Sequence, residues 1–284
     1  MTDSEYLING QSIFVSTDRP VSPPAAYIGG KKQLSNRLAA IIEQIPHTSY
    51  TEPFVGMGGV FFRRQLAPKS EIINDRSGDV ITLFRILQRH YPQFMETLKF
   101  QITSRREFER LKTCDPSTLT DLERAARFLY LQRLSFGGKV SGRTYGVDAQ
   151  GPGRFNINRL GAVLEEVHER LAGVIIENLD WLDFIDRYDH PNALFYLDPP
   201  YFGCEKDYGA DAFARSDFTR MAKRLASIEG RFVLSLNDTP RVREIFAGFQ
   251  FVEATIKYTI SQTKQTTAHE LIILDGRDPG AVNL

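Results

Sequence analysis

Apolar and polar residues follow two periods along the chain, one typical of helices and one typical of short buried strands. Apolar residues recur every three or four positions over 33–45 and again from Val80 onward, which predicts an amphipathic helix in each place. Extended runs that start at 50 and at 70 read as short strands. An apolar segment over 60–66 has the length of a further helix. This alternation of strand and helix favours a parallel, doubly wound sheet.

The second half of the chain continues this alternation and then changes it. Strands are expected at 174–177, 193–197 and 232–236. Two closing strands, near 251–260 and 270–274, are separated by only nine or ten residues. Because so short a link favours an antiparallel hairpin at one edge, we predict an α/β fold with a doubly wound, Rossmann-like sheet and a C-terminal hairpin.

The segment over 92–160 interrupts the alternation of strand and helix. Helical patterns lead there into a glycine-rich, basic loop over 136–146, which is typical of a small, mainly helical inserted module. The main α/β domain is then expected over 25–91 and 161–284. Residues 1–24, rich in Ser, Thr and Pro, are expected to form a terminal arm or a strap across the surface, to which we assign no chemistry.

Charge is balanced overall but unevenly placed. The chain has 35 basic and 35 acidic residues, and this balance alone suggests no polyanionic partner. However, residues 124–159 hold seven basic and one acidic residue, whereas 160–211 hold three basic and twelve acidic residues. The first segment can neutralise phosphates and the second can face a cation. With 42% hydrophobic and 25% charged residues, the composition excludes a disordered or coiled-coil chain.

Several classes of site are not expected. Cys114 and Cys204 lie far apart and form no Cys/His cluster, so neither a metal site nor a disulfide framework is supported. No stretch reaches the roughly 18 consecutive apolar residues that a membrane span needs. The first residues include Asp3 and Glu5 and no apolar run of signal-peptide length. We therefore expect a cytoplasmic protein without a metal or a membrane partner.

The most specific chemical signal is Asp198-Pro199-Pro200-Tyr201, directly after the apolar run 194–197. Doubly wound folds place their ligands at the carboxyl ends of such strands, and two prolines fix the backbone there. The Asp198 carboxylate and the Pro199 carbonyl can accept both hydrogens of an exocyclic amino group, while the Tyr201 ring can stack on the base that carries it. The same residues also suit a rigid turn in which Tyr201 only packs.

A glycine loop offers a second candidate site. Gly56-Met57-Gly58-Gly59 follows a predicted strand and resembles half of a dinucleotide fingerprint, although tight turns also use Gly for purely conformational reasons. Asp75 ends the next predicted strand, 17 residues beyond Gly58, near the roughly 20-residue offset at which an acid meets ribose hydroxyls. Because the full GxGxxG is missing, we expect a nucleoside-containing ligand without a pyrophosphate, and a nicotinamide oxidoreductase is disfavoured.

Five motifs follow one another in a characteristic order. They are Tyr27-Ile28-Gly29-Gly30-Lys31, Glu52-Pro53-Phe54-Val55-Gly56-Met57-Gly58, Asn74-Asp75, Phe136-Gly137-Gly138 and Asp198-Pro199-Pro200-Tyr201. This ordered set resembles the Dam-like family of S-adenosylmethionine-dependent DNA N6-adenine methyltransferases, over about 27–275. The resemblance implies a methyltransferase sheet and transfer of a methyl group to N6 of an adenine flipped out of double-stranded DNA.

The resemblance also implies roles for individual residues. Its catalytic tetrapeptide falls on Asp198, Pro199, Pro200 and Tyr201. The residues implied in binding the cofactor, S-adenosylmethionine, are Tyr27, Gly29, Gly30, Lys31, Glu52, Pro53, Phe54, Gly56, Gly58, Asp75, Asp180, Trp181 and Asp198. Tyr27 stands where a Trp is common in the family.

The family places its DNA-recognition module where the basic insertion lies. The candidate DNA-binding residues are Arg133, Lys139, Arg143 and Arg154. Lys139 and Arg143 can reach guanine O6 and N7, although a phosphate contact or a solvated position is the commoner role for any single one. Gly137 stands where the family often has Asn, so the recognition sequence stays open. A cognate restriction endonuclease is a further partner that the family suggests.

Other functions remain open on the sequence alone. One is methylation of another amine, either an RNA adenine or a glutamine amide in a protein. Glutamine methyltransferases typically have Asn where Asp198 stands, which counts against that substrate. Another is a DNA-binding regulator that keeps the fold without turnover, against which the intact acidic and aromatic positions argue.

Overall fold

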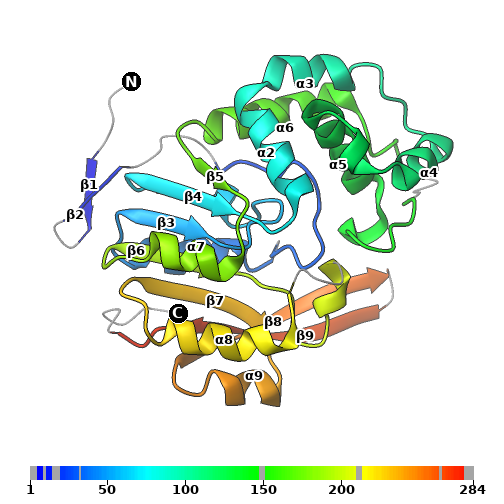
Figure 1. Ribbon diagram of the computed structural model, residues 1–284. Coiled ribbons are helices and arrows are strands. Elements are labelled where there is room, and N and C mark those ends of the chain that lie inside the picture. Colours follow the sequence, from blue (N-terminus) through cyan, green and yellow to red (C-terminus); the bar gives the residue numbers. More distant parts are fainter. Residues whose placement is uncertain are drawn as a thin grey trace.

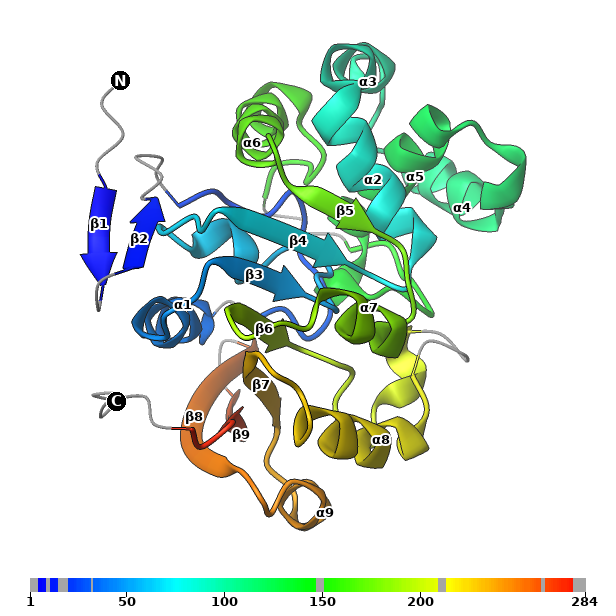
Figure 2. The same ribbon diagram turned by 60° about the vertical axis from the view of Figure 1, so that its left-hand side comes forward.

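The computed structural model describes residues 5–8, 11–14, 20–31, 33–146, 151–208, 213–261 and 264–277. Within these ranges, seven strands form one central sheet in the order β5-β4-β3-β6-β7-β9-β8 (Figures 1 and 2). They are β3 (Ser49–Glu52), β4 (Ser70–Asn74), β5 (Ile175–Glu177), β6 (Ala193–Leu197), β7 (Arg231–Asn237), β8 (Gln250–Ser261) and β9 (Lys264–Leu274). Strands β3 to β7 run parallel, whereas β9 lies antiparallel to both β7 and β8. The predicted doubly wound sheet with a C-terminal hairpin is confirmed.

Helices cover both faces of the sheet (Figure 2). They include α1 (Ser35–Gln44) and α2 (Gly78–Arg89) on one face, and α7 (Trp181–Tyr188), α8 (Arg215–Leu225) and α9 (Pro240–Ile245) on the other. Strand β6 shows why both layers are needed. Its Leu194 and Tyr196 join the core under α1 and α2, whereas Phe195 and Leu197 join the core under α7 and α8. Because neighbouring side chains of a strand point to opposite faces, an all-apolar strand must be covered twice.

The insertion between α2 and β5 is helical, as predicted. It contains α3 (Tyr91–Leu98), α4 (Arg105–Thr113), α5 (Asp121–Leu134) and α6 (Ile157–Arg170), which gather beside α2 in both views (Figures 1 and 2). Phe128 and Leu131 of α5 are fully buried and belong to the same hydrophobic core as α2 and the sheet. The helical group is therefore packed onto the sheet domain, and α6 runs across residue 160, where the sequence placed a boundary.

The apolar segment over 60–66 corrects one prediction, because it forms only a single 3-10 turn, Phe61–Arg63. Arg64 then adopts an extended conformation and pairs with Glu71 of β4, with 2.8 Å between the guanidinium nitrogen and the carboxylate oxygen. Both residues are buried. The apolar run ends at Phe62 and residues 63–65 are polar, so no helical period continues through the segment. The ion pair holds Arg64 against β4 instead.

The predicted terminal arm lies partly outside the described residues. Within it, β1 (Glu5–Ile8) and β2 (Gln11–Phe14) form an antiparallel pair. Val21 is buried, and its N–H donates to the carbonyl of Phe62 at 2.8 Å. The end of this segment is therefore part of the packed body of the protein.

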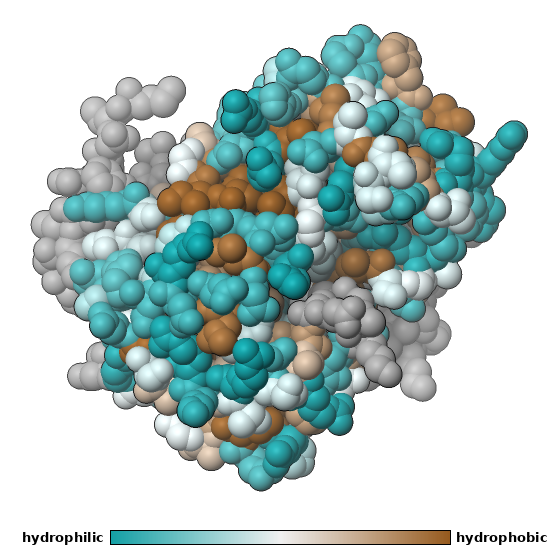
Figure 3. Space-filling view, in the orientation of Figure 1, coloured by the Kyte–Doolittle hydropathy of each residue, from teal (hydrophilic) through white to brown (hydrophobic). Residues whose placement is uncertain are grey.

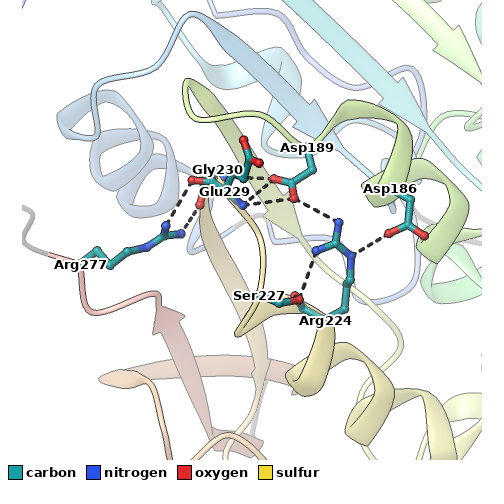
Figure 4. Close-up of polar contacts among 7 residues, drawn as sticks. All are labelled: Asp186, Asp189, Arg224, Ser227, Glu229, Gly230 and Arg277. Carbon is teal, nitrogen blue, oxygen red and sulfur yellow. Dashed lines mark hydrogen bonds and ion pairs between the residues drawn. The ribbon is translucent and has the colours of Figure 1, made fainter.

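A polar network fastens the loops that precede β6 and β7 (Figure 4). The Asp189 carboxylate accepts hydrogen bonds from the backbone N–H groups of Glu229 and Gly230, each at 3.0 Å from one oxygen. It also accepts from Arg224, whose guanidinium reaches Asp186 as well. These contacts hold the amino ends of β6 and β7, at the edge of the sheet opposite to their carboxyl ends.

Of the surface of the described residues, the face shown in Figure 3 is mainly polar. In the face shown in Figure 3, apolar residues form separate patches among polar ones. The large apolar side chains that are exposed are Phe100, Ile102, Phe136 and Ile175. Within the part of the chain that the structure describes, no helix combines the length and the apolar character needed to cross a bilayer.

Candidate active site

Asp198 is the first residue beyond the carboxyl end of β6, and its side chain is only 19% exposed. One carboxylate oxygen accepts a hydrogen bond from the Ser235 hydroxyl at 3.0 Å and lies 2.8 Å from the Lys31 ammonium. Ser235 lies on the adjacent strand β7 and is itself hydrogen-bonded to the Tyr196 hydroxyl. Burial raises the pKa of Asp198, while the Lys31 charge opposes that rise. The carboxylate is thus held in one orientation, which suits a fixed hydrogen-bond acceptor.

Lys31 connects Asp198 to two further groups. Its ammonium donates a hydrogen bond to the Tyr201 hydroxyl at 2.6 Å and lies 4.2 Å from the centre of that ring. It also lies 3.5 Å from a carboxylate oxygen of Glu270, which accepts a hydrogen bond from Tyr201 through its other oxygen. Lys31 and Glu270 are both buried. The corner therefore contains two carboxylates, one ammonium and one phenol in mutual contact.

Glu270 is a site residue that the sequence reasoning missed. It pairs with Asn237, the last residue of β7, and because β9 is antiparallel, this part of β9 meets the carboxyl edge of the parallel strands. A single acid directly before the apolar run 271–274, in a strand expected to return antiparallel, is the signal that points to it.

The glycine loop lies at the same edge of the sheet. Gly56 follows β3, and its N–H donates to one oxygen of the Asp75 carboxylate at 2.9 Å, while the N–H of Ser77 donates to the other at 2.8 Å. A carboxylate oxygen has two acceptor positions, so each can still accept a ligand hydroxyl. Burial raises the pKa of Asp75 to about 6, against the effect of both backbone donors. The group is thus mostly ionised at neutral pH.

One cavity of about 630 Å³ connects the glycine loop with the Asp198 corner. The predicted site residues that line it are Tyr27, Gly29, Gly30, Lys31, Glu52, Phe54, Gly56, Asp75, Asp198, Pro200 and Arg133. The structure therefore brings together segments that lie far apart in the sequence, such as Lys31 and Tyr201, which are 170 residues apart.

Other predicted site residues lie outside the cavity lining. Pro53, Gly58, Pro199 and Tyr201 directly adjoin lining residues in the chain. Asp180 caps the amino end of α7 by accepting a hydrogen bond from Leu182, and Trp181 is buried beside Phe213. The structure gives these last two residues a local structural contact, and their role toward a ligand stays a prediction.

The predicted DNA-binding residues have different surroundings. Lys139 and Arg154 are exposed, whereas Arg133 lines the cavity and donates to the carbonyl of Pro24 at 3.2 Å. Arg143 donates to the Gln132 side chain at 3.3 Å and lies over the Phe128 ring. Only part of the positive charge of the insertion is thus displayed to solvent.

Gln132 links the basic loop to the cavity wall and was also missed from the sequence. Its amide donates to the carbonyls of Ala26 and Gly138, at 2.8 and 2.6 Å. Gly138 in turn accepts a hydrogen bond from the N–H of Ile28, which lines the cavity. An amide on an otherwise apolar, buried stretch of α5 is the signal that indicates such a role.

Glu52 is expected to make stability depend on pH. Burial raises its pKa from 4.5 to about 8, against the hydrogen bond that its carboxylate accepts from Tyr50 at 2.5 Å. Between pH 4.5 and about 8 the folded protein therefore binds a proton that the unfolded chain releases, so stability falls as pH rises through this range. Glu52→Gln should remove this loss, on the order of a few kcal/mol, and raise the free energy of unfolding at pH 8. Urea denaturation of both proteins at pH 5.5 and pH 8 measures it.

The matched control for this prediction is Glu96→Gln, because Glu96 is an exposed carboxylate on α3. Its variant should show the same pH dependence as the wild type. A Glu52→Gln protein that loses as much stability between the two pH values as the wild type would contradict the assignment.

Within the described residues, no three His, Cys, Asp or Glu side chains come together in a way that could hold a metal ion.

Comparison with known proteins assigns the chain to a family. Residues 27–260 match the family described as D12 class N6 adenine-specific DNA methyltransferase. The Type II methyltransferase M.CviBI of Paramecium bursaria Chlorella virus NC1A is 22% identical over 242 residues, covering 84% of this chain and 91% of that protein. The Type II methyltransferase M1.LlaDCHI of Lactococcus lactis is 26% identical over 277 residues, covering 88% of this chain and 94% of that protein. The DNA adenine methylase of Haemophilus influenzae is 24% identical over 284 residues, covering 89% of this chain and 93% of that protein.

Since the family match extends over most of the chain, and the similarity to these relatives extends over nearly their whole length, the chain belongs to the D12 class of N6 adenine-specific DNA methyltransferases.

Proposed function

We propose that the protein transfers a methyl group from S-adenosylmethionine to N6 of an adenine that is rotated out of double-stranded DNA. The observation that carries this proposal is the single cavity that joins the Asp198 corner to the glycine loop and Asp75. A methyl donor and an acceptor amine have to meet within bonding distance, and a shared cavity allows that.

The residues around the glycine loop fit the proposed donor. Asp75 keeps acceptor positions for the two ribose hydroxyls. The Tyr27 ring lies so close to Gly56 that a Cβ there would come within 3.0 Å of it, so backbone and ring together form a narrow wall. Asp75 and Asp198 also place carboxylates beside the cavity, and ionised carboxylates favour a cation. When bound, S-adenosylmethionine supplies an electrophilic methyl group on a positively charged sulfur.

The Asp198 corner suits an amino group that must be made nucleophilic. The lone pair of adenine N6 is delocalised into the ring, and hydrogen bonds from N6 to Asp198 and to the Pro199 carbonyl would localise it. Ser235 and Lys31 hold the Asp198 carboxylate in place for this contact. Rotating a base out of the duplex costs a few kcal/mol, and stacking on Tyr201 would offset roughly 1–3 kcal/mol of that.

The test is methyl transfer from isotopically labelled S-adenosylmethionine to duplex DNA and, in parallel, to RNA. We expect label in DNA, recovered as N6-methyladenine after hydrolysis to nucleosides. Label found mainly in RNA would indicate an RNA adenine methyltransferase instead. Binding of DNA without any methyl transfer would favour a DNA-binding regulator. Methylation of another base in place of adenine, such as cytosine, would contradict adenine N6 as the acceptor.

Lys139 is expected to contribute a phosphate contact. Because it is exposed on the basic loop, Lys139→Ala should lower DNA affinity similarly for all sequences and reduce the slope of log K against log salt by about 0.9. Binding isotherms at several salt concentrations measure this slope. The control is Lys223→Ala, an exposed lysine on α8, which should leave it unchanged. A change in sequence preference with an unaltered slope would instead make Lys139 a base reader.

A further inference from the structure

A second carboxylate lies beside Asp198, and the proposed reaction gives it no task. Glu270 is 1% exposed and lies outside the segment 27–260 that matches the family. It contacts both Lys31 and Tyr201, through different oxygens. A buried carboxylate is costly unless it is paired, so its presence in this corner calls for a physical explanation.

The position of Lys31 provides an explanation for the buried Glu270 carboxylate. Its ammonium lies 2.8 Å from one oxygen of the Asp198 carboxylate and 2.6 Å from the Tyr201 hydroxyl, 4.2 Å from the centre of that ring. The proposed reaction uses the same two side chains, Asp198 as acceptor and Tyr201 as stacking partner, for the target adenine. Because Lys31 contacts one oxygen of Asp198, the amino group of adenine can approach the other oxygen while Lys31 stays in place.

Glu270 is the second counter-charge that holds Lys31 in this place. Among the described residues, Asp198 and Glu270 are the carboxylates within 4.0 Å of the Lys31 nitrogen. One oxygen of Glu270 lies 3.5 Å from the ammonium, within ion-pair range, and attracts it without displacing it from Asp198. The other oxygen of Glu270 accepts a hydrogen bond from the Tyr201 hydroxyl, so the same carboxylate also anchors the phenol.

We propose that Glu270 is a positioning residue of the methyl-transfer site, which holds the Lys31 ammonium and anchors the Tyr201 hydroxyl so that Asp198 and the ring of Tyr201 stand in fixed positions for the target adenine. This inference rests on the proposed function. It assigns Glu270 no contact with the substrate, and its effect passes through the two neighbours that it holds.

The first experiment is Glu270→Gln, which keeps the size of the side chain and an acceptor for Tyr201 but removes the charge. We expect the single-turnover rate of methyl transfer at saturating DNA to fall by about tenfold or more, with the dissociation constants for DNA and S-adenosylmethionine within about threefold of wild type. Glu270→Asp keeps the charge but withdraws it from Lys31, and should give an intermediate rate. The matched control, Glu253→Gln on the neighbouring strand β8, removes an exposed carboxylate and should stay within about twofold.

A double variant separates positioning from a merely structural role. Lys31→Met leaves two buried carboxylates without their cation, so in that background Glu270→Gln should slow transfer no further and should raise the thermal unfolding midpoint. Equal slowing by Glu270→Gln in both backgrounds, or a wild-type rate in the single variant, overturns the proposal. If the Glu270→Gln single variant does not fold, two other measurements test the proposal. They are the transfer rate of Glu270→Asp, and the thermal unfolding midpoints of Lys31→Met with and without Glu270→Gln.

The wild-type protein in the same assay keeps the two proposals apart. A wild type that transfers no methyl group to duplex adenine contradicts the proposed function. A wild type that is active, beside a Glu270→Gln variant that is equally fast, contradicts only the role of Glu270.

Discussion

Asp198→Ala should abolish methyl transfer and leave DNA binding close to that of the wild type. The substitution removes the acceptor that would orient the target amine, at the end of the central strand. Loss of one preorganised group of this kind typically slows the chemical step by about 10²- to 10³-fold, and we expect at least that. Single-turnover transfer to duplex DNA measures the rate, and equilibrium binding to the same duplex measures the affinity.

Two further variants make this result specific to the corner. Asp198→Asn keeps one acceptor oxygen but loses the charge that Lys31 faces, so its rate should lie between those of alanine and wild type. Asp183→Ala removes an exposed carboxylate from α7 and should leave the rate unchanged. Parallel loss of DNA affinity and of rate in Asp198→Ala would show that Asp198 serves folding or binding, and would count against its role in the reaction.

Much of the fold was predictable because several strands are short apolar runs that end at strong turn residues, as β6 ends before Asp198-Pro199-Pro200. The expected strand at 193–197 coincides with β6, and the expected antiparallel hairpin at the end of the chain is present. The segment over 60–66 was not predictable in this way. Its apolar residues 60–62 are followed by Arg-Arg-Gln, and its conformation depends on Arg64 reaching Glu71, a contact that no local pattern contains.

The residues of the site divide in the same way, into those that a local sequence pattern predicts and those that a distant contact determines. Asp75 and Asp198 follow strands β4 and β6, and both strands adjoin β3 in the sheet. Because parallel strands end at a common edge, motifs that follow such strands are expected to meet there. Glu270 instead depends on the register of the antiparallel strand β9, and Gln132 depends on which face of α5 meets the segment before Lys31. Both choices are made by tertiary packing, which residue spacing alone does not encode.

Counting charges overstates the basic surface of the insertion. Arg127 is buried and donates to the carbonyl of Leu111, and Arg124 pairs with Asp79 at 2.5 Å. Arg127 thus joins two helices of the insertion, and Arg124 fastens the insertion to α2. In contrast, Lys139 and Arg154 are exposed. A phosphate-binding surface should therefore be sought around the exposed pair, because a charge already used inside the protein releases few counterions from DNA.

Gly58→Ala should destabilise the protein more than any other single-methyl change in the glycine loop. Gly58 has φ of +72°, a conformation that costs an L-residue about 1–2 kcal/mol. In addition, a Cβ there would lie 2.4 Å from the Phe62 ring, which is buried and packed against Phe61 and Phe84. Since this ring has little room to move, we expect a total loss of about 2–4 kcal/mol in the free energy of unfolding, measured by urea denaturation.

Gly173→Ala is the matched control, because Gly173 has φ of +77° but no atom within 4 Å of the added Cβ. It should show only the backbone cost, about 1 kcal/mol. The two variants should also differ in donor binding. Moving the loop at Gly58 displaces the N–H of Gly56 from Asp75, so affinity for S-adenosylmethionine, measured by equilibrium dialysis, should fall in Gly58→Ala and stay unchanged in Gly173→Ala. Equal stability losses in the two variants would mean that the Phe62 ring yields to the added methyl group, and that the tight turn reflects backbone conformation alone.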